Sequence, residues 1–143
     1  MTNSEENLDI YWLLMKVMFQ AKHEITAVAD DLGLTLMQAS ALTVLKLDEP
    51  LPMNTLSNLF KCDASNVTGI IDRLEKHNLI RRQDHPTDRR VKMIALTPAG
   101  IKTRDTILQR TVELEARRLG PVLTIDDQAK LRAILQKITA GQA

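Results

Sequence analysis

Apolar residues recur at helical spacing over most of the chain and give way to strand-like runs in one short region. The first helical stripe covers residues 8–31, and Gly33 follows where such a helix would end. Further apolar residues lie off that stripe, namely Ile10, Leu13, Leu14 and Val17. A helix that is hydrophobic almost all round must be buried on more than one side. Because a chain of 143 residues offers little cover of its own, we expect a partner subunit to supply it.

Five further helices are expected downstream, and four of them have a suitable residue near the start. We place them at residues 35–47, 53–60, 64–77 and 98–119, and from residue 125 onward. Thr35 and Asp63 are good N-caps, and Thr97-Pro98 sets a hydroxyl before a proline at a first helical position. Thr124 begins a capping box in which Asp127 replaces the usual Glu or Gln. The expected core-facing residues of the shortest helix are Leu56, Leu59 and Phe60.

One region has the pattern of β-structure instead. Residues 79–82 and 91–96 read as two strands, and the segment between them, 84–88, is rich in turn formers. Pro50 and Pro52 force an extended backbone that suits a short edge strand. The pattern therefore predicts a mainly α single domain, of the α+β kind, with about six helices and two or three strands.

The helix at 64–77 has two sharply different faces. Val67, Ile70, Ile71 and Leu74 fix the inward face by their spacing. The opposite face carries short hydroxyl and amide groups, then charges, which suits base edges and phosphates in a DNA major groove. These candidate DNA-binding residues are Ser65, Asn66, Thr68, Gly69, Asp72, Arg73 and Lys76. The alternative is a solvated polar face, with Gly69 tolerated for helix packing at a cost of about 1 kcal/mol.

The preceding helix and the following hairpin complete the pattern. Helix 53–60 and the turn after it pair with helix 64–77 as a helix-turn-helix, and Asn54 and Thr55 at its start could meet a phosphate. At the hairpin tip, Asp88-Arg89-Arg90 offers arginines to a narrow minor groove, with the aspartate holding one of them in place. Alternatively, these charges only keep strand edges from pairing. The fold expected is a winged helix-turn-helix.

Charge and composition narrow the choice of function. Residues 1–52 hold three Lys/Arg against eight Asp/Glu, whereas residues 53–92 hold eight against five. This local excess of basic residues favours phosphate contact, although a mixed solvated surface remains the alternative. With only four aromatic residues, a stacking platform for single-stranded nucleic acid is not expected. One cysteine, Cys62, excludes an internal disulfide and a multi-cysteine zinc site.

Three motifs together resemble one known family. Residues 72–82 read DRLEKHNLIRR, residues 88–90 read DRR, and residues 96–100 read LTPAG. In this order and spacing they are similar to the MarR family of winged helix-turn-helix regulators. Asn78 stands where that family usually has glycine, a departure that Asn accommodates because it tolerates positive φ. The specific match covers roughly residues 51–100.

The resemblance implies a transcriptional regulator that binds double-stranded DNA as a homodimer. In such a protein residues 1–34 and 98–143 would form the dimerisation helices and residues 35–97 the winged DNA-binding lobe. The operator would be pseudo-palindromic. Family members are often repressors released by a small phenolic or anionic effector. Candidate effector-pocket residues, which could equally be core and dimer interface, are Tyr11, Trp12, Met15 and Met37.

Other functions find little support in the residues. The three histidines show no zinc-protease spacing and no catalytic triad signature, so we expect no enzyme activity, metal or cofactor. The acidic N-terminus does not fit a secretory signal, and no apolar run could span a membrane, so a cytoplasmic protein is expected. Two alternatives stay open: an oxidant-responsive regulator using Cys62, and a winged-helix protein-interaction module without DNA readout.

Overall fold

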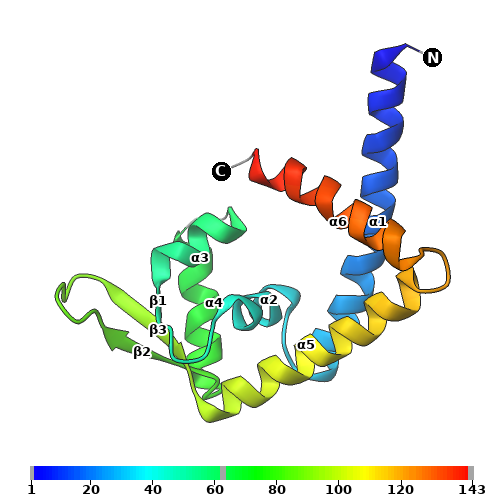
Figure 1. Cartoon of the computed structure of the whole chain (residues 1–143). Coiled ribbons are helices and arrows are strands. Elements are labelled where there is room, and N and C mark those ends of the chain that lie inside the picture. Colours follow the sequence, from blue (N-terminus) through cyan, green and yellow to red (C-terminus); the bar gives the residue numbers. More distant parts are fainter. Residues whose placement is uncertain (1, 62–63, 142–143) are drawn as a thin grey trace. The chain divides into compact units, whose positions relative to one another are not determined.

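The computed structural model describes residues 2–61 and 64–141 and contains helices and one small sheet (Figure 1). The helices are α1 (Asn3–Asp31), α2 (Leu36–Val44), α3 (Met53–Phe60), α4 (Ala64–Lys76), α5 (Pro98–Leu119) and α6 (Ile125–Ala140). The strands are β1 (Leu51–Pro52), β2 (Ile80–Asp84) and β3 (Lys92–Leu96). The predicted fold class, mainly α with about six helices and two or three strands, is confirmed. Across the described residues, no helix combines the length and hydrophobicity that crossing a membrane requires.

Capping residues define most helix starts. Thr35 with Gln38 and Thr124 with Asp127 form capping boxes, as the sequence predicts. At Asp127 the hydrogen bonds from the Thr124 hydroxyl and backbone N–H lower the pKa of the carboxyl group. The first helix begins at Asn3, five residues before the predicted Leu8, because Thr2 caps it in a box with Glu5. Asp63, the cap expected for α4, lies outside the described residues.

The end of α2 differs from the prediction. The helix ends at Val44 rather than near Leu47, since Leu45 is already extended, with φ −73° and ψ 136°. Arg104 of α5 donates a hydrogen bond from Nε to the Leu45 carbonyl at 2.8 Å. This bond satisfies a carbonyl that the helix leaves free and secures the first half of α5 to the end of α2.

The sheet is antiparallel in the order β1-β3-β2. Leu51 of β1 lies opposite Ile94, which confirms the predicted short edge strand between the two prolines. On the other side of β3 the pairing runs from Ile80 with Leu96 to Asp84 with Lys92. We call β2, β3 and the turn of residues 85–91 between them the wing, which extends at the left of Figure 1.

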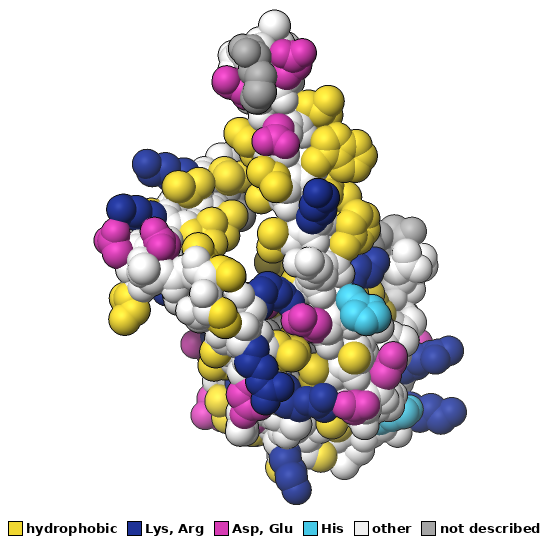
Figure 2. Space-filling model, turned by 90° about the vertical axis from the view of Figure 1, so that its right-hand side faces the viewer, with side chains coloured by type: hydrophobic (Ala, Val, Ile, Leu, Met, Phe, Trp, Pro, Cys, Tyr) yellow, Lys and Arg dark blue, Asp and Glu magenta, His cyan; other side chains and the backbone are white. Residues whose placement is uncertain are grey.

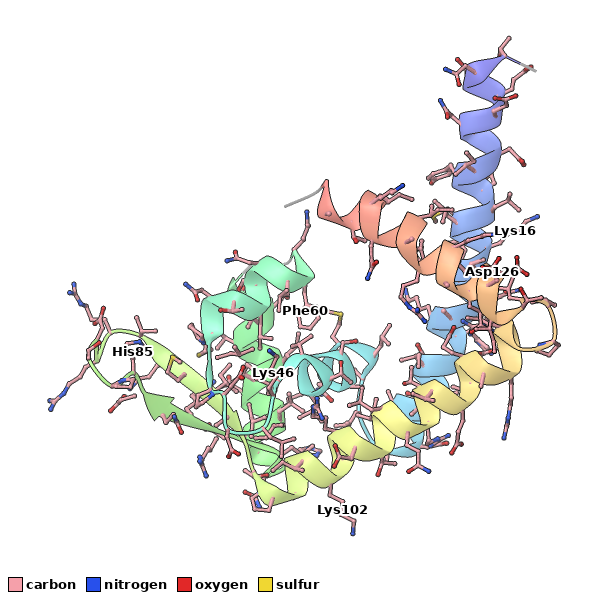
Figure 3. All side chains as sticks on the ribbon, viewed as in Figure 1. Lys16, Lys46, Phe60, His85, Lys102 and Asp126 are labelled. Atoms are coloured by element: carbon pink, nitrogen blue, oxygen red, sulfur yellow. The ribbon has the colours of Figure 1, made fainter. Side chains whose placement is uncertain are left out.

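One hydrophobic core joins α2, α3, α4, the sheet and the first half of α5. Its largest fully buried side chains include Leu42, Leu45, Leu56, Ile71, Leu74, Ile80, Ile94 and Ile107. Phe60 packs against this core from α3 and is labelled in Figure 3. The prediction that Leu59 faces inward is wrong, because its side chain is 55% exposed. A helix of eight residues presents one narrow stripe to the core, and Leu56 and Phe60, four residues apart, occupy it.

The chain divides into two compact units within α5, at Leu108. In the first unit α1 buries only Val28 and Ala29, and its earlier turns expose large apolar side chains. Figure 2 shows these hydrophobic groups along the upper turns of the helix. In the second unit α6 has no buried residue, and Leu131, Ile134 and Ile138 are partly exposed.

Candidate nucleic-acid interface

Helix α4 is anchored by one face and presents the other to solvent. Val67, Ile71 and Leu74 are buried in the core, and Ile70 packs against it. All seven residues predicted on the opposite face are exposed: Ser65, Asn66, Thr68, Gly69, Asp72, Arg73 and Lys76. The hydrophobic anchor thus fixes which polar side chains point away from the protein. This face is continuous along the helix from its first turn to its last.

Gly69 lies on the exposed face with open space around it. A Cβ built at this position would meet no atom within 4 Å. Packing within the chain therefore gives no reason for a residue that weakens a helix by about 1 kcal/mol relative to alanine. The open space leaves room for an external surface to approach the α4 backbone closely.

An ion-pair network ties α4 to β2. Arg82 pairs with Asp72, and its Nη1 donates to Glu75 Oε1 at 2.7 Å. The backbone N–H of Arg82 also donates to Glu75 Oε2 at 3.2 Å. These carboxylates, with the Asp72 hydrogen bond first, raise the pKa of Arg82 against a smaller opposing effect of burial. The ion pairs of Arg82 were not predictable, because no spacing rule links a strand residue to a carboxylate on the preceding helix. From the sequence, Asp72 is expected only among the DNA-facing residues.

A second junction holds α4 to the start of α5. Asn78 has φ 58°, so the backbone turns there in the left-handed conformation that glycine or asparagine favours. Thr97 donates from Oγ1 to the Asn78 carbonyl at 2.6 Å and accepts from the Gly100 N–H at 3.0 Å. A Cβ on Gly100 would lie 1.8 Å from the Leu79 carbonyl oxygen. The contacts of residues 96–100 therefore fix the position of the start of α5 relative to the end of α4.

The wing tip carries two arginines in different settings. Asp88 Oδ1 accepts a hydrogen bond from the Arg90 N–H at 3.0 Å and lies 3.4 Å from Arg90 Nε. Most of the Arg90 side chain nevertheless remains in solvent, at 94% exposure. Arg89 is exposed and has no ion-pair partner among the described residues. One arginine is thus held by the predicted aspartate, while the other projects from the turn.

Carboxylates on this face are paired, which leaves a positive excess. Asp72, Asp84 and Asp88 pair with Arg82, Lys92 and Arg90, respectively. Among residues 2–61 and 64–141, the cations at Arg73, Lys76 and Arg89 make no ion pair. Unpaired cations beside a row of hydroxyl and amide groups form a surface suited to a polyanion.

The start of α3 borders the wing. A cavity of about 300 Å³ is lined by Met53, Asn54, Arg90, Val91 and Lys92. Asn54 is exposed there, so the structure brings it beside the cationic wing. Thr55, the other residue predicted at this helix start, is partly buried and does not line the cavity.

The residues predicted for an effector pocket lie on the first two helices. Tyr11 and Trp12 are exposed neighbours whose ring centroids lie 5.1 Å apart, edge to face. Met15 and Met37 are partly exposed on α1 and α2. Two further cavities lie elsewhere, one of about 250 Å³ beside the α2–β1 loop and one of about 330 Å³ between α6 and Leu119.

Two other expectations concern Cys62 and metal binding. Cys62, the candidate redox residue, lies outside the described residues. Within the described part of the chain, no three His, Cys, Asp or Glu side chains gather in a group that could hold a metal ion.

The region that contains α3, α4 and the wing is similar in sequence to known proteins. The model of the MarR family matches residues 34–92. The uncharacterized HTH-type transcriptional regulator YfiV of Bacillus subtilis is 30% identical over 94 residues, which are 66% of this chain and 59% of YfiV. The HTH-type transcriptional repressor MdtR of the same organism is 27% identical over 139 residues, 96% of this chain and 89% of MdtR.

Solved structures match over most of the chain. A probable transcriptional regulator from Pseudomonas aeruginosa is 32% identical, with a TM-score of 0.67, over 85% of this chain and 93% of that one. A MarR-family regulator from Rhodococcus sp. RHA1 is 25% identical, with a TM-score of 0.80 and 96% of both chains covered. A mutant of MepR from S. aureus, solved bound to an oligodeoxyribonucleotide, shares the fold at 23% identity and a TM-score of 0.63, over 94% of this chain and 98% of that one.

Proposed function

The chain belongs to the MarR family of transcriptional regulators, and we propose that it binds a pseudo-palindromic double-stranded DNA site as a homodimer. The observation that carries this proposal is the exposed face of α4, with its hydroxyl and amide groups, beside the unpaired cations Arg73, Lys76 and Arg89. Short polar groups read base edges, and cations bind the phosphates on either side.

In the proposed complex α4 enters the major groove and the wing reaches the neighbouring minor groove. The close approach that α4 needs is compatible with the open space at Gly69. Arg89 and Arg90 at the wing tip provide the cations that a narrow minor groove attracts. Asn54, at the start of α3, would contact a phosphate between these two elements. The MepR mutant, which shares the fold, was solved bound to an oligodeoxyribonucleotide, and this supports DNA as the partner.

The exposed apolar surface of the isolated chain supports the proposed homodimer. Trp12, Leu13 and Phe19 on α1 are each more than half exposed. Such a surface is costly in water, and it is suited to a second copy of the same helix region. Two copies would present two α4 helices to half-sites about one turn of DNA apart.

We further propose that the protein is a repressor and that a small phenolic or anionic molecule releases it from DNA. The relative MdtR is named as a repressor. Effector release would couple the α1 surface around Tyr11 and Trp12 to the DNA-binding lobe. The measurement is operator affinity in the presence of 4-hydroxybenzoate, where a weaker affinity with unchanged folding supports release.

A selection experiment tests the DNA-binding proposal. The full chain is incubated with a random pool of duplexes, and the recovered sequences are footprinted with hydroxyl radicals. Two protected half-sites related by pseudo-twofold symmetry would support a homodimer that reads the major groove. Recovery of no enriched sequence would refute sequence-specific binding and favour a winged-helix protein-interaction module. Peroxide treatment of the wild type and of Cys62→Ser then separates the oxidant-responsive alternative, which requires weaker binding only when Cys62 is present.

A further inference from the structure

The turn of the wing, residues 85–91, is closed at its base by two contacts. The ammonium group of Lys92 pairs with Asp84 across the last position of the ladder. The backbone N–H of His85 then donates to the Val91 carbonyl at 3.2 Å. Beyond this point strand pairing ends, so other contacts must hold the turn that carries the arginines.

The imidazole of His85 supplies those contacts. Its Nδ1 accepts hydrogen bonds from the backbone N–H groups of Thr87 and Asp88, each at 3.2 Å. The Thr87 hydroxyl lies 3.3 Å from the same nitrogen. An imidazole nitrogen accepts a hydrogen bond only when it carries no proton. The arrangement therefore requires the neutral ring with its proton on Nε2. In Figure 3 His85 lies at the wing, within the loop at its end.

Asp88 connects this imidazole to the arginine. Its N–H is held by His85, and its carbonyl accepts from the Val91 N–H at 3.0 Å. Its carboxylate in turn holds the backbone and the guanidinium group of Arg90. The contacts run from His85 through Asp88 to Arg90, and each step is a direct hydrogen bond or ion pair.

We propose that His85 is a positioning residue for DNA binding, because its unprotonated Nδ1 holds the wing turn that presents Arg90. The inference rests on the proposed DNA-binding function. When His85 takes up a proton, Nδ1 becomes a donor facing two other donors, and the turn loses these bonds. Specific DNA affinity should therefore be full while the ring is neutral and fall when the ring takes up a proton.

Other charged groups lie around His85. Those described on the turn and at its base are Asp84, Asp88, Arg89, Arg90 and Lys92. Both carboxylates are paired with cations. A protonated ring would add a positive charge near phosphate, but that attraction is independent of DNA sequence. Comparing a selected duplex with a scrambled one separates the two effects.

An NMR measurement on the free protein tests the geometry without DNA. A long-range ¹⁵N–¹H spectrum of the full chain reports the tautomer of His85, assigned from the His85→Asn variant. We expect the Nε2–H form at neutral pH, with the Thr87 and Asp88 amide signals moving together as His85 protonates. A neutral ring with its proton on Nδ1 would overturn the proposal. So would amide signals that ignore this titration.

Binding to a duplex recovered by selection provides the functional arm. Wild-type affinity, measured at constant ionic strength from about pH 8 to about pH 5.5, should fall about fivefold, the effect of losing roughly one hydrogen bond. His85→Asn keeps a side-chain acceptor for the turn and does not titrate, so it should bind as wild type at pH 8 and show no such fall. His85→Ala should bind more weakly at both ends of the range. The His77→Asn variant controls for the histidine at the end of α4.

The outcomes separate the two proposals. An equal fall in wild type and His85→Asn, or equal affinity of His85→Ala and wild type at pH 8, would overturn the role of His85 while leaving DNA binding intact. Absence of any selected duplex would refute the proposed function. The NMR result would then still decide whether His85 holds the turn.

Discussion

The two wing arginines are adjacent in sequence but differ in what holds them. Asp88 restrains Arg90, whereas Arg89 projects from the turn without an ion-pair partner among the described residues. A restrained side chain loses less conformational entropy when it binds. In the proposed complex Asp88 would therefore contribute to binding indirectly, although its own charge would repel phosphate.

Removing either arginine tests the wing. We expect Arg89→Ala and Arg90→Ala each to lower affinity for the selected duplex by at least about tenfold and to reduce the salt dependence. Stability should change by less than about 0.5 kcal/mol because both side chains are exposed. Lys102→Ala removes an exposed lysine of α5 as the matched control (Figure 3) and should bind normally. Unchanged affinity in both wing variants would remove the wing from the proposed interface.

Gly69 can be tested for binding and stability at once. Gly69→Ala adds a methyl group to open space inside a helix, so the folded state should gain up to about 1 kcal/mol. DNA affinity should fall, because the same methyl group would obstruct close approach to the α4 backbone. Thermal unfolding and fluorescence anisotropy measure the two effects. A stabilised variant with wild-type affinity would show that DNA does not approach this backbone.

Gly100 should respond in the opposite way. In Gly100→Ala the new methyl group would overlap the Leu79 carbonyl, and the junction between α4 and α5 must shift. We expect a loss of about 1–3 kcal/mol in the free energy of unfolding, the usual cost of overpacking. Denaturant unfolding beside Gly69→Ala provides a control with the same change of residue. Equal stability of Gly100→Ala and wild type would contradict the tight contact.

At the scale of elements, Arg82 couples the helix proposed to read DNA to the strand that leads to the wing. Arg82→Gln removes the charge that neutralises Asp72 and Glu75. We expect a loss of about 1 kcal/mol in stability, modest because these groups are partly solvated, and weaker DNA binding. A double-mutant cycle with Asp72→Asn measures the coupling, which should exceed about 0.5 kcal/mol. Additive effects would mean that the two side chains act independently.

Most elements were predictable from the sequence because their local signals agree with their packing. Residues 53–60 and 98–119 form helices with the predicted bounds, and the stripe from Val67 to Leu74 correctly gives the buried face of α4. The capping boxes at Thr35 and Thr124 are likewise as predicted. In each case the same residues determine the local conformation and the contact with the core.

The errors have both local and distant causes. Helix α2 ends early, and Arg104, distant in sequence, hydrogen-bonds to the Leu45 carbonyl at its end. Leu59 is hydrophobic but lies off the narrow buried stripe of α3. The partners of Arg82 come from a different element, so no spacing rule reveals them. For the candidate site, the exposed face of α4 was predictable from its helical spacing. The hydrogen bonds of His85 were not, because they depend on how the turn folds.

At the scale of the whole molecule, the exposed apolar surface of α1 is the proposed dimer interface. We expect the double variant Leu14→Glu and Met18→Glu to weaken dimerisation at least about a hundredfold, because an interface would have to bury unpaired carboxylates. Sedimentation equilibrium measures this change. Lys16→Glu, on the same helix, alters an exposed charge and should leave the dimer intact. A wild-type chain that is monomeric at micromolar concentration would contradict the proposed homodimer.

The central claim is sequence-specific binding of double-stranded DNA, and fluorescence anisotropy at two salt concentrations tests it most directly. The full chain is titrated into a labelled duplex recovered by selection and into a scrambled duplex of equal length. We predict tight binding to the selected duplex, at least about a thousandfold stronger than to the scrambled one, and a steep loss of affinity as salt rises. Equal and weak affinity for the two duplexes, or affinity that does not change with salt, would contradict the account.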